Sequence, residues 1–180
     1  MKEYKILVTG TVGAGKTTAI RAISDIEPVV TDVANHDSTV DKPKTTVGLD
    51  YGLLSLDNGD RIRLFGTPGQ ARFDFLWQIL VHKAIGLVIL IDHSRPDPLA
   101  DLAMFLDGFA NHMHALPCVI GVGRHDIDGG LPFERYADLL EQRALVVPIL
   151  AVDVRQRADV LLLIDTLLGQ IEAGMPLDLP

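Results

Sequence analysis

The sequence predicts an α/β fold in which helices cover both faces of a mostly parallel sheet. Apolar runs alternate with segments of helical spacing along the 180 residues, and several runs are continuous, as in strands buried on both faces. A glycine-rich turn also joins the first predicted strand to the first predicted helix. We place one domain at residues 1–180, with about six strands, one antiparallel edge hairpin and about five helices.

The N-terminal half supplies a strand, a helix and the hairpin. The predicted elements are, in order, a strand at 5–8, a helix at 16–26, and strands at 47–56 and 61–65. The last two flank Asp57-Asn58-Gly59-Asp60, and Asn-Gly tolerates the positive φ of a tight hairpin turn. These two strands are therefore predicted to pair antiparallel.

The C-terminal half repeats a strand and a helix three times. The predicted elements are strands at 85–92, 118–122 and 146–152, and helices at 97–114, 132–143 and 158–173. The three strands are nearly continuous apolar runs, which is typical of central parallel strands.

The polar stretch 31–44 has no obvious element. A connection this long inside a compact domain is usually functional or disordered. Two interpretations are open: an extra strand near Val29-Val30, or an extended and mobile segment. We favour mobility, because residues 35–38 and 41–44 are poor strand formers.

Composition excludes several classes of function. The net charge of −8 gives no basic footprint for nucleic acid, and the longest apolar run, 84–91, is far short of the roughly 20 residues that a membrane helix needs. The single cysteine, Cys118, lies in an apolar stretch, which predicts a buried, inert thiol and a reducing compartment. We therefore expect a cytoplasmic location, with no integral membrane segment.

The strongest motif is a phosphate-binding loop that matches G-x-x-x-x-G-K-[ST] in full. Its backbone N–H groups would curl around phosphate oxygens, and the following helix would point its positive dipole end at the same anion. Lys16 would reach the terminal phosphates, and the Thr17 hydroxyl would hold Mg²⁺. The predicted nucleotide-binding residues here are Gly10, Thr11, Val12, Gly13, Ala14, Gly15, Lys16, Thr17 and Thr18.

This loop predicts a P-loop NTPase three-layer sandwich but does not choose between ATP and GTP. It also leaves open a kinase, a motor and a switch. Two further segments narrow the class. Residues 64–73, Leu-Phe-Gly-Thr-Pro-Gly-Gln-Ala-Arg-Phe, resemble the D-T-A-G-Q-E-R-F switch segment of Ras-like small GTPases. Residues 43–48 resemble the first switch of that family, especially its Arf branch.

The resemblance covers nearly the whole chain, with three motifs in the expected order. It is nearest in appearance to bacterial small GTPases of the gliding-polarity type, which work with roadblock-fold regulators. The resemblance implies GTP/GDP and Mg²⁺ as cofactors, and Gln70, Lys16 and Thr46 as catalytic residues. Thr46 would contact Mg²⁺ with Thr17, although Thr45 competes for the role, and Gly69 would offer its backbone N–H to the terminal phosphate.

The residues that would read the base are only partly those of the family. Gly123-Arg124-His125-Asp126 stands where the family has N-K-x-D. Asp126 would accept two N–H groups from guanine, and Arg124 would cover the base as a flat cation. Gly123 lacks the amide that ties this loop together. Asp153-Val154-Arg155 is a weak version of the family's S-A-K. A backbone N–H in this loop, at the predicted binding residues Asp153 and Val154, would contact the base oxygen.

A second departure concerns the metal site. Gly66 occupies the position of the aspartate that the family places in the second shell of magnesium. We therefore expect Mg²⁺ to be held less tightly.

The resemblance implies a GTP-binding switch with slow hydrolysis that a partner accelerates, acting in intracellular signalling or polarity. A roadblock-fold regulator or a GTPase-activating protein is the expected partner, and the sequence does not identify the effector. The alternatives are a nucleotide-dependent scaffold without hydrolysis and a P-loop small-molecule kinase.

Two other groups of residues have competing interpretations. Trp77, Phe73 and Phe75 follow the second switch and are predicted either to pack in the core or to form an exposed patch for a partner. His93 is predicted to lie on the surface at a strand end.

Overall fold

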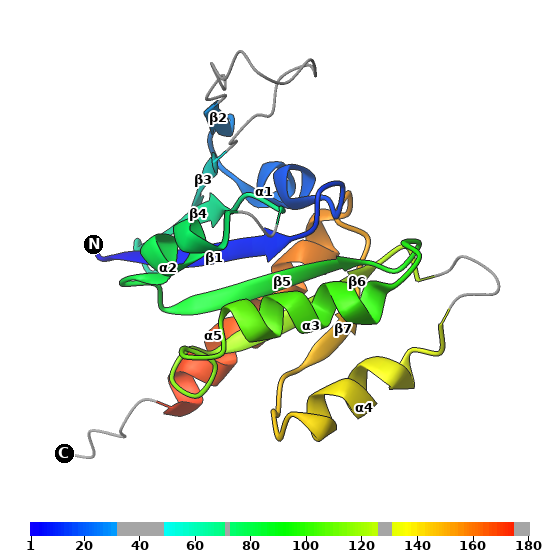
Figure 1. Ribbon diagram of the computed structural model, residues 1–180. Coiled ribbons are helices and arrows are strands. Elements are labelled where there is room, and N and C mark those ends of the chain that lie inside the picture. Colours follow the sequence, from blue (N-terminus) through cyan, green and yellow to red (C-terminus); the bar gives the residue numbers. More distant parts are fainter. Residues whose placement is uncertain (32–48, 71–72, 126–130, 175–180) are drawn as a thin grey trace, which may run out of the picture.

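A seven-stranded sheet forms the centre of the computed structural model, which describes residues 1–31, 49–70, 73–125 and 131–174 (Figure 1). The strand order is β2-β3-β4-β1-β5-β6-β7. The strands are β1 (Glu3–Gly10), β2 (Val29–Thr31), β3 (Leu49–Ser55), β4 (Arg61–Gly66), β5 (Gly86–Asp92), β6 (Cys118–Gly123) and β7 (Ile149–Ala151). β4, β1, β5, β6 and β7 are parallel, and β3 pairs antiparallel with β4. This arrangement confirms the predicted α/β fold.

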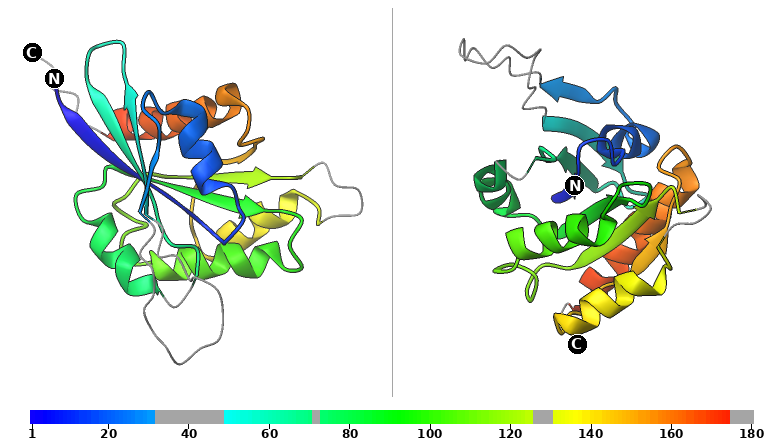
Figure 2. Two further views of the ribbon diagram at one scale, coloured as in Figure 1. Left: turned by 90° about the horizontal axis from the view of Figure 1, so that it is seen from above. Right: turned by 45° about the vertical axis from the view of Figure 1, so that its right-hand side comes forward.

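Within the described residues, five helices cover the sheet on both faces (Figure 2). They are α1 (Lys16–Ile23), α2 (Asp74–Val81), α3 (Pro98–Gly108), α4 (Glu134–Gln142) and α5 (Arg157–Gly174). α1 and α5 lie on one face, and α2, α3 and α4 on the other. The three layers place the carboxyl ends of the parallel strands at one edge, where α1 and α3 begin.

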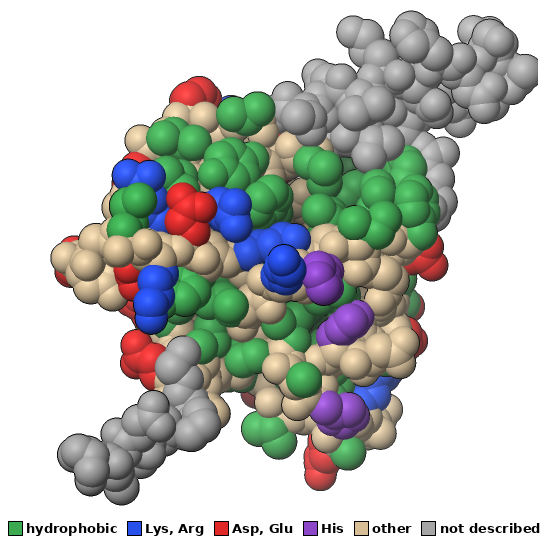
Figure 3. All heavy atoms as spheres, turned by 90° about the vertical axis from the view of Figure 1, so that its left-hand side faces the viewer, with side chains coloured by type: hydrophobic (Ala, Val, Ile, Leu, Met, Phe, Trp, Pro, Cys, Tyr) green, Lys and Arg blue, Asp and Glu red, His purple; other side chains and the backbone are tan. Residues whose placement is uncertain are grey.

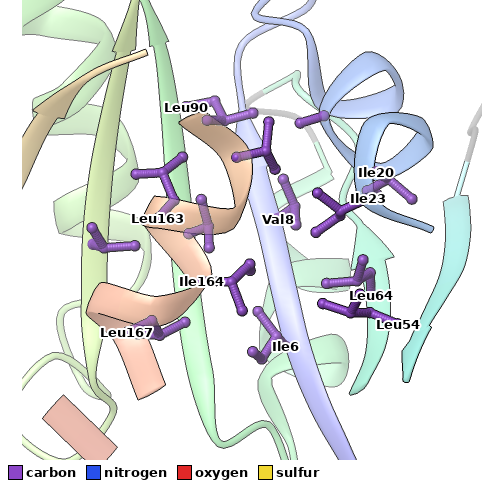
Figure 4. Packing of buried hydrophobic residues seen from close by; sticks show 14 of the residues in the cluster. Ile6, Val8, Ile20, Ile23, Leu54, Leu64, Leu90, Leu163, Ile164 and Leu167 are labelled. Carbon is purple, nitrogen blue, oxygen red and sulfur yellow. The ribbon is translucent and has the colours of Figure 1, made fainter. Parts of the chain in front are cut away.

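Each face of the sheet has its own hydrophobic core, because successive strand residues point to opposite faces. In β1, Ile6 and Val8 pack under α1 and α5, whereas Leu7 packs under α2 and α3. Figure 4 shows the first core, in which Leu163 of α5 and Ile20 of α1 lie on either side of Val8. The continuous apolar strands of the sequence are thus buried on both sides.

The structure contains the extra strand that we weighed against mobility. β2 pairs antiparallel with β3, with Val29 opposite Tyr51, so our preference was wrong for residues 29–31. β-branched residues suit a strand, and pairing covers the backbone edge that β3 would otherwise expose. The rest of the polar stretch, residues 32–48, lies outside the described residues.

Several predicted elements are too long, two of them by four or more residues. The helix predicted at 97–114 ends at Gly108, and turns follow it. The Trp77 ring packs against Gly108, 2.7 Å from where a Cβ would stand, so this position accepts no larger residue. The strand predicted at 146–152 is shortened to Ile149–Ala151. The sequence did not locate α2.

Cys118 lies buried in β6, and burial raises the pKa of its thiol far above the ordinary value. The inert thiol is therefore as predicted. Within the described ranges, no helix combines the length and the apolar character needed to span a membrane.

Candidate nucleotide-binding site

The phosphate-binding loop joins the end of β1 to the start of α1. Gly13 and Gly15 both have positive φ, 85° and 92°, and Gly15 is the N-cap of α1. This geometry turns the chain back on itself within a few residues, and it directs the unpaired N–H groups of the first turn of α1 toward the loop. An anion-binding concavity results.

Lys16 lies within this loop. Its Nζ donates to the carbonyl oxygens of Gly10 and Thr11, both at 2.8 Å. Burial lowers the pKa of Lys16 to about 8, and the nearby Asp50 carboxylate opposes that shift. The ammonium is therefore already largely desolvated at the place where a bound phosphate would meet it.

The hydroxyl of Thr17 has a partner that the sequence did not suggest. Thr17 Oγ1 donates to Asp50 Oδ2 at 2.6 Å, and Asp50 lies on β3, only 6% exposed. A signal was available, because Asp50 is an acidic residue in a half-buried strand predicted to pair with the strand ending at Gly66.

The second switch segment, described by the structure over residues 64–70, packs through Gly69 on the phosphate loop. A Cβ on Gly69 would lie 2.6 Å from both the carbonyl oxygen of Gly10 and the backbone nitrogen of Val12. Thr67, two residues before Gly69, is held against β1, because its N–H donates to the carbonyl of Val8 at 2.9 Å. Gln70 follows immediately and is half-buried. The structure thus brings the predicted residue Gly69 to the predicted loop, and the predicted residue Gln70 follows it directly in the chain.

A pocket of about 610 Å³ extends from the phosphate loop toward the loops after β6 and β7. Lys16 and Thr17 line one part of it, and Arg124, Asp153 and Val154 line another. These predicted residues therefore share one cavity. Asp126, Thr45 and Thr46 lie outside the described residues.

Arg124 links the two parts of the pocket. With a φ of 55°, it directs its Nη1 to the Asp92 carboxylate and, at 3.5 Å, to the carbonyl of Gly13. This ion pair connects the loop after β6 to the end of β5 and to the phosphate loop. Gly123 has no side chain to hold this loop in place, and these contacts of Arg124 hold it instead.

In the loop after β7, the structure fixes Asp153 by both its backbone and its side chain. Its backbone N–H donates to the Asp159 carboxylate at 2.8 Å and so is already used within the protein. Its carboxylate pairs with Arg155, and the hydrogen bonds from Arg155 lower the pKa of Asp153 to about 2. Val154 packs against Gly15, which fixes this loop on the phosphate loop.

The donor set suits Mg²⁺. Magnesium favours hard oxygen ligands and takes few of them from protein when phosphates supply others. The Thr17 hydroxyl is such a ligand. Across the described ranges, no group of three or more His, Cys, Asp or Glu residues stands ready to hold a metal alone.

Both interpretations of the aromatic residues apply, each to a different side chain. Trp77 is buried against Phe105 and Phe109, and its Nε1 donates to the carbonyl of Pro68 at 2.9 Å. Phe75 and Ile79 lie four residues apart on α2 and are 57% and 64% exposed. Figure 3 shows the side of the molecule that includes α2, where hydrophobic side chains are interspersed with basic ones.

The prediction for His93 was wrong. It is only 6% exposed, and its Nδ1 lies 2.9 Å from the Tyr136 hydroxyl of α4. A buried imidazole is stable here because the hydroxyl satisfies a ring nitrogen.

No protein-family model matches the chain. Curated relatives match at low identity. An uncharacterized protein of Methanocaldococcus jannaschii is 29% identical over 52% of this chain and 53% of its own length. Intraflagellar transport protein 22 of Chlamydomonas reinhardtii is 24% identical over 70% and 64%, and the pig Ras-related protein Rab-32 is 26% identical over 62% and 46%.

The chain thus spans about half to two thirds of the length of these relatives. The matches include several Ras-related proteins, and they support a Ras-like small GTPase.

Proposed function

We propose that this chain is a GTP-binding molecular switch that hydrolyses GTP slowly and is accelerated by a partner. The observation that carries the proposal is the contact of Gly69 with the backbone of the phosphate loop. A phosphate held by that loop would meet the segment that carries Gln70. Binding would therefore favour one position of this segment, and loss of the phosphate would release it.

The residues divide the work of hydrolysis. The N–H groups of the loop and the Lys16 ammonium bind and orient the phosphates, and Gln70 orients the attacking water. Mg²⁺, held by Thr17 and by Thr46, would neutralise charge on the phosphate oxygens. This scheme needs positioning and charge stabilisation more than covalent chemistry.

We propose guanine as the base. The proposal rests on Asp126, which would accept two N–H groups from guanine, and on Arg124 as a cation over the ring. The ion pair with Asp92 holds the guanidinium of Arg124 at the pocket wall, where a flat base could stack on it.

We further propose that the chain resembles gliding-polarity and Arf-like GTPases and acts in signalling or polarity, with a roadblock-fold regulator or a GTPase-activating protein as its partner. The arginines of the pocket support the need for a partner. Arg124 is paired with Asp92 and Arg155 with Asp153, so both arginines that line the described pocket are engaged. An arginine supplied from elsewhere can add roughly 10³ to 10⁵ to the rate.

Two measurements test this function. Competition between GTP and ATP for a fluorescent GDP analogue should show a strong preference for GTP. Single-turnover hydrolysis should be slow, on the order of 10⁻⁴ to 10⁻² per second, and should be nearly lost in Gln70→Leu while binding is retained. Equal GTP and ATP affinity would refute the guanine assignment.

The alternatives predict different outcomes in the same assays. A scaffold would bind GTP and show equal, negligible hydrolysis in wild type and Gln70→Leu. A small-molecule kinase would release little phosphate to water and would instead transfer the phosphoryl group to a second substrate. The close packing of Gly69 on the phosphate loop favours the switch over the kinase.

A further inference from the structure

The end of β4 has a glycine, Gly66, and no carboxylate, but the neighbouring strand β3 provides one, Asp50, next to the phosphate loop. Gly66 ends β4, and the strand register places Asp50 of β3 directly opposite it. Residues directly opposite in an antiparallel pair point to the same face of the sheet. A Cβ on Gly66 would lie 2.9 Å from the Cβ of Asp50 and 3.1 Å from its Oδ2. The space over Gly66 is therefore filled by the Asp50 side chain.

Asp50 directs the Thr17 hydroxyl. A threonine hydroxyl has one proton to donate and two lone pairs that accept or ligate. Here the proton is committed to Asp50 Oδ2 at 2.6 Å. The lone pairs of Thr17 Oγ1 consequently point away from the carboxylate and are available to a cation.

Charge gives a second, independent reason. Asp50 is only 6% exposed, and a buried carboxylate is costly unless nearby positive charge compensates it. The Lys16 ammonium lies in the phosphate loop, where it donates to the carbonyl oxygens of Gly10 and Thr11, and it would also serve the phosphates. A divalent cation at Thr17 would compensate both Asp50 and the phosphates.

We propose that Asp50, from the neighbouring strand, supplies the carboxylate of the Mg²⁺ site that Gly66 cannot supply. Asp50 is a positioning residue: it accepts a hydrogen bond from the Thr17 hydroxyl and adds negative charge beside the metal. This inference rests on the proposed nucleotide function. It revises the expectation, drawn from Gly66 alone, that Mg²⁺ is held weakly.

The test measures how Mg²⁺ slows the release of a fluorescent GDP analogue, which does not depend on hydrolysis. Asp50→Asn keeps an oxygen that can accept from Thr17 but removes the charge. It should raise the Mg²⁺ concentration for half-maximal retention by about 10- to 100-fold, the usual effect of losing an outer-shell partner. Asp57→Asn, on the exposed turn of the same hairpin, is the control and should match wild type.

A swap distinguishes metal binding from damage to the fold. Gly66→Asp alone should destabilise the protein, because its Cβ would clash with Asp50. The double variant Asp50→Gly with Gly66→Asp moves the carboxylate across the strand pair and removes that clash. It should restore the Mg²⁺ response to within a few-fold of wild type, and its thermal midpoint in EDTA should exceed that of Gly66→Asp.

Each result decides the matter. An unchanged Mg²⁺ midpoint in Asp50→Asn overturns the role of Asp50 while leaving GTP binding intact. A shifted midpoint that the swap does not restore, in a folded double variant, also overturns it. Failure of the wild-type protein to bind any guanine nucleotide, with or without Mg²⁺, would overturn both this inference and the proposed function.

Discussion

The buried ammonium of Lys16 makes the stability of the nucleotide-free protein depend on pH. The pKa of Lys16 is about 8 in the folded protein, whereas an ordinary lysine has 10.5. Between these values the unfolded chain holds more protons than the folded one. The free energy of unfolding must therefore rise with pH through this window, because the folded state sheds a desolvated charge.

The magnitude follows from the two pKa values. Integrating the difference in bound protons from pH 7 to pH 10 gives a stabilisation of about 2–3 kcal/mol from Lys16 alone. Below pH 7 the contribution is flat, since Lys16 is then protonated in both states. The effect has the opposite sign to that of a lysine stabilised by a carboxylate.

Urea denaturation of nucleotide-free protein at pH 7 and pH 10 measures the effect, with Lys16→Met as the test variant. Lys16→Met should lack the rise, so the difference in free energy of unfolding between wild type and variant should change by about 2–3 kcal/mol over this range. Lys2→Met removes an exposed lysine and controls for net charge. The same change with pH in wild type and Lys16→Met would refute the reasoning.

Three further predictions concern packing, base choice and a buried pair. Gly69→Ala should cost about 1–3 kcal/mol in urea denaturation, because its Cβ meets backbone atoms, whereas Gly169→Ala, in open space on α5, should stabilise by about 0.5–1 kcal/mol. Asp126→Asn should shift preference from guanine to xanthine nucleotides in competition binding, and an unchanged preference would remove Asp126 from base reading. Tyr136→Phe should lower stability by about 1–3 kcal/mol by leaving the His93 ring nitrogen without its partner, and thermal melting that matches wild type would contradict this.

The parts of the site that belong to one continuous segment could be predicted from sequence. The phosphate loop is such a segment, since its glycines and Lys16 act through the local backbone. The same holds for the central strands, where unbroken apolar runs require burial on both faces. These features depend on neighbours within a few residues, which a pattern can represent.

Features that depend on pairing between distant segments could not be predicted in the same way. Asp50 gains its role only when β3 and β4 pair in a register that sets it opposite Gly66. His93 looked like a surface residue because its partner, Tyr136, comes from a helix 43 residues later. The need for glycine at position 108 of α3 is likewise set by the Trp77 ring, which comes from α2.

Trp77 gives this protein an internal optical reporter. It is the only tryptophan in the chain, and its indole N–H donates to the carbonyl of Pro68, one residue before Gly69. The ring stacks on Phe109 and is fully shielded from water. Because indole emission responds to its hydrogen bond and its solvation, movement of the Pro68 carbonyl would change the protein's own fluorescence. The position of the second switch segment can therefore be followed in unlabelled protein, in real time, without a modified nucleotide.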